Sequence, residues 1–228
     1  MNPFQKIKSA VNKCQRFFIN RSLQRKLTNQ GMTVISANCV GAFILHDLHQ
    51  PFNSPFVNLY LSPQDFLRYL QNMDFYLTQS LTFVQTENSY PVGKLADLEI
   101  HFMHYHSELE ANEKWQLRMS RIKLDNLFIM MTDRDGVTEK EIQLFDQLPF
   151  KNKVIFTHKP YPAFKSAYYI KGFEKQNQAG DIFEFSGWNG KKYYDQFDYV
   201  KWFNQASSIK AALQPFLFRC KSKNLYNA

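Results

Sequence analysis

A chain of 228 residues is long enough for one large domain or two small ones, and its 44% hydrophobic and 21% charged residues are those of a folded globular protein. This composition excludes intrinsic disorder, and no run approaches the roughly 20 apolar residues that span a bilayer. Three widely spaced cysteines exclude a disulfide framework and a paired zinc motif, and their odd number favours a reducing compartment. We therefore expect a cytoplasmic protein.

The net charge of +8 is concentrated at the amino terminus, because residues 1–46 hold seven Lys and Arg and no acidic residue. Basic segments attract nucleic acids, phosphorylated small molecules and lipid headgroups. Because the basic stretch is local and no recognised DNA- or RNA-binding motif occurs, we do not expect a nucleic acid partner. A phosphorylated ligand or an anionic lipid surface fits the local charge better.

Residues 3–27 predict a basic amphipathic helix. Apolar side chains recur there at helical spacing, with Lys and Arg in much of the remainder: Phe4, Ile7, Val11, Cys14, Phe17 and Phe18. Two interpretations stay open, a helix packed on the domain and a reversible contact with the inner face of a membrane or with a partner. We treat residues 1–30 as a basic helical segment and 31–228 as a single α/β domain.

Short apolar runs alternate with helical segments from residue 32 to 157. Strands are predicted at 32–36, 81–85, 98–105, 127–131 and 153–157, and helices at 40–48, 62–80, 108–122 and 138–148. The alternation predicts a three-layer α/β fold, in which a largely parallel sheet is flanked by helices. Beyond Pro160 the pattern is irregular, with short strands at 168–171 and 182–185 and a helix at 195–213.

Polar residues follow several of these strands, and ligands of open parallel sheets bind outside the carboxyl ends of the strands. These residues are Ser36, Asn38, Cys39, His104, His106, Asp133, Asp135, His158 and Lys159. Cys39 comes just before a predicted helix, whose dipole lowers the pKa of a thiol, and Ser36 or Asn38 could donate a hydrogen bond to an oxyanion. The alternative is that Cys39 is a small buried residue and Asn38 a helix cap.

Histidines cluster in the segment His101-Phe102-Met103-His104-Tyr105-His106. On a strand, His104 and His106 would share one face, but no third metal ligand follows by spacing, so no metal site is predicted. A general base from His104 or His158 is the catalytic interpretation. Histidines with purely structural hydrogen bonds are the alternative.

Trp115, Arg118 and Arg121 are spaced to lie along one helix surface. Two guanidinium groups beside an indole could hold a phosphate and stack on a sugar or base, whereas salt bridges to Glu110 or Glu113 would make the same surface structural. No glycine-rich phosphate loop and no Gly-x-Ser-x-Gly elbow occurs, which excludes classical dinucleotide, P-loop and α/β-hydrolase sites.

Several motifs occur in a recognisable order between residues 31 and 175. They are Ser36-Ala37-Asn38-Cys39, Asn53-Ser54-Pro55-Phe56, Tyr90-Pro91-Val92-Gly93, His101-Phe102-Met103-His104-Tyr105 and Lys153-Val154. The series resembles a bacterial family of unknown function often described as exopolysaccharide or capsule biosynthesis proteins. In that family the turn usually reads Asn-Cys-Trp-Gly-Gly, whereas Val40 and Ala42 replace the Trp and the second Gly here. A more distant likeness is to capsule acetyltransferases, which bind coenzyme A.

The resemblance implies a cytoplasmic transferase of surface polysaccharide synthesis, such as an acyltransferase that uses a coenzyme A thioester. Its partner would be a phosphorylated or nucleotide-linked sugar, or a glycan. The residues assigned to catalysis are Ser36, Asn38, Cys39 and His104. The residues assigned to substrate binding are Trp115, Arg118, Arg121, Asp133 and His158. The alternative hypothesis is a non-catalytic glycan- or phosphoglycan-binding protein that assists an assembly complex at the membrane.

Overall fold

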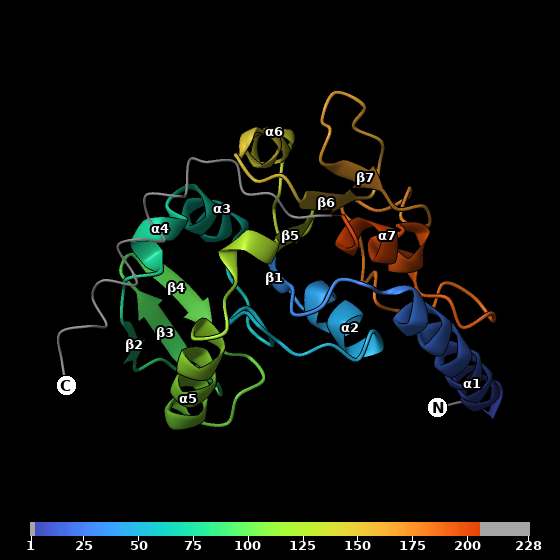
Figure 1. Ribbon diagram of the computed structural model, residues 1–228, viewed down its shortest axis with the longest axis horizontal. Coiled ribbons are helices and arrows are strands. Elements are labelled where there is room, and N and C mark those ends of the chain that lie inside the picture. Colours follow the sequence, from blue (N-terminus) through green and yellow to red (C-terminus); the bar gives the residue numbers. More distant parts are fainter. Residues whose placement is uncertain (1–2, 206–228) are drawn as a thin grey trace.

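A four-stranded parallel sheet lies at the centre of the computed structural model, which describes residues 3–205 (Figure 1). The strand order is β1-β5-β6-β7, and every neighbouring pair is parallel. The strands are β1 Thr33–Ser36, β5 Leu127–Thr132, β6 Lys153–Thr157 and β7 Ala167–Tyr169. Helices lie in the connections from β1 to β5 and from β5 to β6, as is usual between parallel strands, whereas residues 158–166 join β6 to β7 without a helix.

The central strand β5 is buried on both faces, which explains its unbroken apolar sequence. Phe128 and Met130 belong to one hydrophobic cluster and Ile129 and Met131 to the other, because successive side chains point to opposite faces. The same alternation separates the apolar residues of β1 and β6 between the two clusters.

Helices cover both faces of this sheet, and the predicted three-layer α/β fold is confirmed. One face packs against α3 Pro63–Gln71, α5 Glu108–Met119 and α6 Glu139–Gln147. The other face packs against α2 Val40–Asp47 and α7 Tyr199–Phe203. The remaining helical elements of the described chain are short: α4 Met73–Tyr76 and the single turns Leu124–Asn126 and Tyr193–Gln196.

Residues 81–101 form a second, antiparallel sheet beside the central one (Figure 1). Its strands are β2 Leu81–Val84, β3 Val92–Leu95 and β4 Leu98–His101. Only Ala96 and Asp97 separate β3 from β4, and so short a connection permits only antiparallel pairing. The prediction that 81–85 and 98–105 join the parallel sheet was therefore wrong, and the second of these strands ends at His101.

The amino-terminal helix α1, Pro3–Lys26, packs on the domain with its polar side inward. Asn12 and Arg16 are its buried residues, whereas Phe4, Ile7 and Phe18 are exposed. Within residues 3–205, no helix combines the length and apolar character needed to cross a membrane. Of the predicted helix at 195–213, the structure shows the five residues of α7 as helix, residues 195–196 belong to the turn Tyr193–Gln196, and residues 206–228 lie outside the described range.

Candidate functional site

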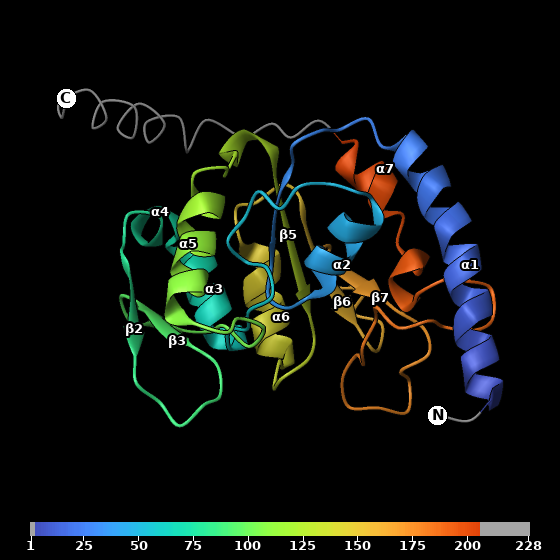
Figure 2. The same cartoon turned by 90° about the horizontal axis from the view of Figure 1, so that it is seen from below.

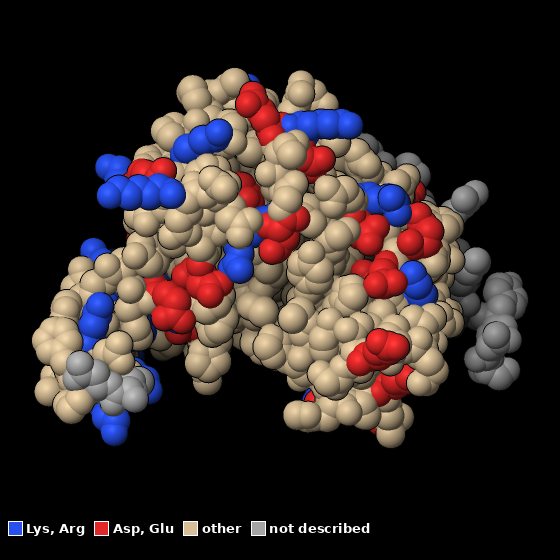
Figure 3. All heavy atoms as spheres, turned by 180° about the vertical axis from the view of Figure 1, so that it is seen from behind, with Lys and Arg blue, Asp and Glu red and all other residues tan. Residues whose placement is uncertain are grey.

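The carboxyl ends of β1, β5 and β6 meet at one edge of the central sheet, where all four parallel strands point the same way (Figure 2). Figure 3 looks onto that edge, and Asp and Glu side chains gather near the middle of the face, with Lys and Arg between them. Asn38 follows β1, Asp133 follows β5 and His158 follows β6. The topology thus places three of the predicted residues at adjacent strand ends.

Asp133 and His158 form a carboxylate–imidazole pair between neighbouring strands. Asp133 Oδ2 lies 2.5 Å from His158 Nδ1 and also accepts the backbone N–H of His158 at 2.8 Å. Its other oxygen, Oδ1, accepts the backbone N–H of Ala179 at 2.7 Å. The Asp133 side chain is 2% exposed and that of His158 13%, so the carboxylate is sealed in while the imidazole still reaches the surface.

This arrangement determines which nitrogen of His158 can act as a base. A carboxylate only accepts hydrogen bonds, so Nδ1 must carry the proton that points to Asp133. In the neutral ring, Nε2 is then the unprotonated nitrogen. A buried carboxylate that orients an imidazole in this way is the arrangement that enzymes use to prepare a general base.

Asn38 links the turn after β1 to the end of β5. Its Nδ2 donates to Thr132 Oγ1 at 2.7 Å, and its Oδ1 accepts from the backbone N–H of Val40 at 3.2 Å. One N–H of the amide remains beyond the bond to Thr132, because a carboxamide nitrogen has two. Asn38 is half-buried at the same edge as Asp133, so its amide donor and the imidazole base of His158 lie at the same edge of the sheet.

Ser36 is sealed beneath the turn and is not presented to a substrate. Its side chain is buried, and its Oγ accepts the backbone N–H of Gly41 at 3.3 Å. A β-carbon at Gly41 would lie 2.8 Å from Cβ of Ser36, so only glycine permits α2 to approach the strand this closely. This close contact gives Ser36 and Gly41 a role in packing α2 against β1.

Cys39 precedes α2 as expected, but the predicted lowering of its thiol pKa was wrong. Burial raises the pKa of Cys39, Arg134 counteracts the rise and Asp181 adds to it. Arg134 and Asp181 are themselves an ion pair, so the guanidinium charge beside the thiol is largely compensated. The site therefore does not favour a Cys39 thiolate as nucleophile.

Tyr60, which lies outside the antiparallel sheet but is bridged to it, contributes a side chain near the loop after β5. Burial raises the pKa of Tyr60, and the charges of Asp135 and Asp65 raise it further, which places the phenol near the Asp135 loop. Tyr60 forms an isolated bridge with His101 at the end of β4. Asp135 has a φ of 61°, a left-handed conformation with which the chain leaves β5 sharply.

Sequence reasoning missed four residues of this edge: Tyr60, Thr132, Arg134 and Asp181. Thr132 and Arg134 flank Asp133 in the same strand-end run, so the signal that found Asp133 could have included them. Asp181 comes from the irregular segment after residue 160, where no pattern predicts a position. In the part of the chain with described coordinates, no three His, Cys, Asp or Glu residues lie close enough together to hold a metal ion.

Residues 10–204 match the family model of a domain of unknown function, DUF1919. The chain belongs to the DUF1919 family. A Haemophilus influenzae (strain Rd) protein described as uncharacterized is 95% identical to it over 206 residues, which is 90% of this chain and all of that protein. Membership of a bacterial family of unknown function is thus established, and the link to surface polysaccharides stays a prediction.

The remaining predicted site residues of the DUF1919 protein form no hydrogen bond or ion pair with Asp133 or His158. Trp115 is buried between Phe56 and Phe102 in the core. Arg118 donates to the Tyr105 hydroxyl at 2.5 Å, so its guanidinium serves the packing of α5. The prediction that these residues share a ligand surface is not supported.

Arg121 and His104 are exposed, but neither joins the pair. Arg121 follows α5, two residues before Lys123, whose backbone N–H bonds to Thr33 at the start of β1. It therefore lies toward the amino end of the parallel sheet, opposite the candidate site. His104 lies in a turn beyond β4, because that strand ends at His101, and so the predicted strand face shared with His106 does not form.

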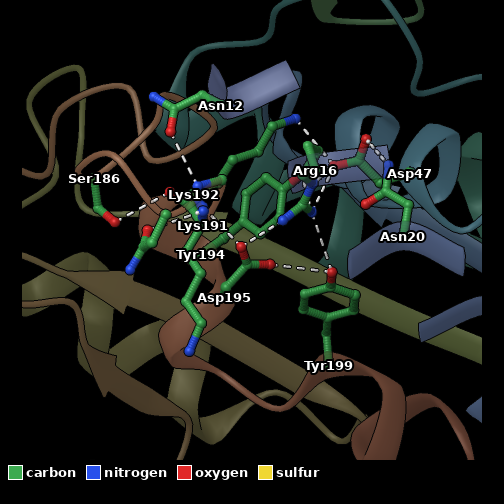
Figure 4. A network of polar contacts seen from close by, with 12 residues as sticks. Asn12, Arg16, Asn20, Asp47, Ser186, Lys191, Lys192, Tyr194, Asp195 and Tyr199 are labelled. Carbon is green, nitrogen blue, oxygen red and sulfur yellow. Dashed lines mark hydrogen bonds and ion pairs between the residues drawn. The ribbon is translucent and has the colours of Figure 1, made fainter. Parts of the chain in front are cut away.

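A buried ionic network attaches α1 to the domain within the DUF1919 match (Figure 4). Arg16 pairs with Asp47 of α2 at 2.7 Å and with Asp195 at 2.5 Å. Burial by itself would raise the pKa of Asp47, but the hydrogen bond from Tyr194 and the charges of Arg16 and Lys192 outweigh it, so the pKa lies below its ordinary value. The packed-helix interpretation of residues 3–27 is confirmed, and the network is structural.

Proposed function

We propose that the protein is a transferase that moves a group, such as an acyl group from a coenzyme A thioester, onto a hydroxyl of a sugar or glycan precursor. The observation that carries the proposal is the Asp133–His158 pair at the carboxyl edge of the sheet. The choice of a phosphorylated or nucleotide-linked sugar, and of surface polysaccharide synthesis as the pathway, is supported by the motif series between residues 31 and 175.

His158, rather than His104, is the base in this proposal, because its Nδ1 is held by a buried carboxylate. Its Nε2 takes the proton of the acceptor hydroxyl as that oxygen attacks the thioester carbonyl carbon. The carbon–sulfur bond then breaks, and the imidazolium returns the proton to the departing thiolate of coenzyme A. No covalent enzyme intermediate is needed, which agrees with the sealed Ser36 hydroxyl and the raised pKa of Cys39.

Asn38 supplies the hydrogen bond to the oxyanion that develops in this step, through the amide N–H not used by Thr132. Asp133 is a positioning residue, since it acts through the imidazole. Its replacement by Asn would present an N–H to Nδ1 or leave it unpaired, and the ring would lose its tautomer and orientation.

The test is transfer of radiolabelled acetyl groups from acetyl-coenzyme A to a panel of nucleotide sugars, with wild-type protein and single variants. We expect His158→Gln to lower kcat by about 10²- to 10⁴-fold, the usual contribution of a general base. Asp133→Asn should lower kcat and displace the acidic limb of the pH profile, which a purely structural loss would not move. His46→Gln, on the exposed side of α2, is the control.

Two results would overturn the proposal. One is activity lost in His104→Gln and retained in His158→Gln. The other is the absence of transfer to any sugar together with thermal stabilisation by oligosaccharides alone, which would identify a binding protein without catalysis.

A further inference from the structure

The outer face of α1 is apolar although its inner face is polar. Phe4, Ile7 and Phe18 are 61%, 59% and 66% exposed, whereas Asn12 and Arg16 are buried. Figures 1 and 2 agree that α1 lies along the rim of the molecule, with its outer side turned away from both sheets. Ordinary surface helices bury the apolar side, so this orientation needs a reason.

The exposed apolar residues form one continuous stripe, which we call the α1 stripe. It consists of Phe4, Ile7, Val11, Cys14 and Phe18, spaced alternately by three and four residues. Residues at this spacing lie above one another on one side of a helix. The stripe faces away from the side that carries Asn12 and Arg16, so it stays largely exposed when α1 docks on the domain, and Phe4 at its amino-terminal end contacts Trp188.

An exposed tryptophan extends the α1 stripe at its amino-terminal end. Trp188 is 42% exposed and packs edge-on against Phe4, with ring centroids 5.0 Å apart. Lys8 Nζ lies 5.9 Å from the centre of the same indole. Tryptophan is enriched where proteins meet the headgroup region of a bilayer, because its ring is apolar and its N–H is polar.

Cations flank the stripe, and α1 itself holds no acidic residue. Six cationic residues lie on α1 besides Arg16: Lys6, Lys8, Lys13, Arg21, Arg25 and Lys26. None of the six forms an ion pair with any residue in the range 3–205. Arg21 and Arg25 line a shallow hollow of about 310 Å³ with Gln24. Figure 3 shows Lys and Arg among uncharged surface at its lower left, where α1 lies.

We propose that the α1 stripe docks the protein on an anionic lipid surface. Apolar side chains would enter the boundary between headgroups and acyl chains, while the flanking cations contact lipid phosphates. A second copy of this chain is not the expected occupant, because two α1 helices packed face to face would bring the six cations of one helix against the six cations of the other. The inference does not depend on the transferase proposal, because the α1 stripe includes none of the residues assigned to catalysis.

The test is co-sedimentation of the full-length protein with vesicles of phosphatidylcholine, with and without phosphatidylglycerol. We expect binding to the anionic vesicles that weakens as salt rises, and little binding to phosphatidylcholine alone. Ile7→Ser combined with Phe18→Ser should abolish it, because both side chains are exposed and would have entered the lipid. Phe75→Ser, which removes a 50% exposed ring from α4, is the matched control and should bind as wild type does.

Charge variants give a second, independent measure. Lys6→Gln and Lys13→Gln should each weaken partitioning into anionic vesicles, by about fivefold per cation removed, whereas Lys114→Gln on α5 should not. Unchanged thermal midpoints would show that every variant folds. Equal binding by wild type and the Ile7→Ser, Phe18→Ser variant would overturn the proposal. The proposal would also be overturned if the wild-type protein did not bind vesicles and instead formed a dimer, or a complex with an acidic protein, that the same variant abolishes.

Discussion

Replacing Arg16 by Ala should detach α1 from the domain and destabilise the whole protein. Its guanidinium contacts two buried carboxylates, Asp47 at 2.7 Å and Asp195 at 2.5 Å, and all three side chains are at most 9% exposed. Removing one partner of a buried ion pair costs about 3–5 kcal/mol, because the other charge is left without compensation. Lys192 stays 3.0 Å from Asp47, so we expect the lower end, about 3 kcal/mol.

For a chain of this size, a loss of that magnitude lowers Tm by about 6–12 °C. Urea unfolding followed by tryptophan fluorescence measures the free energy directly, and limited proteolysis reports whether α1 becomes accessible. Lys13→Ala, an exposed cation on the same helix, is the control and should stay within about 0.5 kcal/mol of wild type. A loss below about 1 kcal/mol in Arg16→Ala would refute the view that this network holds α1 in place.

Three further predictions concern stability. Gly41→Ala should cost about 1–3 kcal/mol, because the new methyl would meet Ser36 at 2.8 Å, whereas Gly187→Ala has no neighbour closer than 3.9 Å and should be neutral in the same urea titration. Trp115→Ala should cost about 3–5 kcal/mol as a core truncation, and a loss no larger than that of the exposed Leu117→Ala would contradict the core assignment. The pKa of Asp47 is lower in the folded protein, so the ionised carboxylate stabilises the fold above its ordinary pKa of 3.8, and this stabilisation is lost as the pH falls through the lower folded pKa. Asp47→Asn should therefore flatten the acid side of the curve of unfolding free energy against pH. An unchanged curve would exclude Asp47 as a cause of the acid destabilisation.

The central sheet and half of the candidate site could be predicted from the sequence because both depend on local patterns. An unbroken apolar run marks β5, and Asp133, the first residue after the strand, lies where parallel sheets bind ligands. His158 follows β6 for the same reason. The pairing between Asp133 and His158 was not predicted, since it depends on which strands are neighbours.

The features that the sequence did not reveal depend on contacts between residues distant in the chain. Periodicity revealed an apolar side on α1, but the partners of Arg16 lie 31 and 179 residues away, and they decide which side is buried. Spacing placed Trp115 and Arg118 on one helix without revealing that α5 buries the indole and runs toward the amino end of the sheet. Assigning 81–85 and 98–105 to the parallel sheet overlooked β3, which lies between them in the chain and pairs antiparallel with both.

The two carboxylate oxygens of Asp133 accept hydrogen bonds from different parts of the chain, which couples the position of the His158 ring to the segment around Ala179. One oxygen orients the His158 ring and the other holds the main chain at Ala179, within a stretch that has no regular secondary structure. Gly180 beside it has no room for a side chain, because a β-carbon would lie 2.5 Å from the Phe173 ring. An insertion or a displaced residue in this stretch would consequently tilt the imidazole of His158.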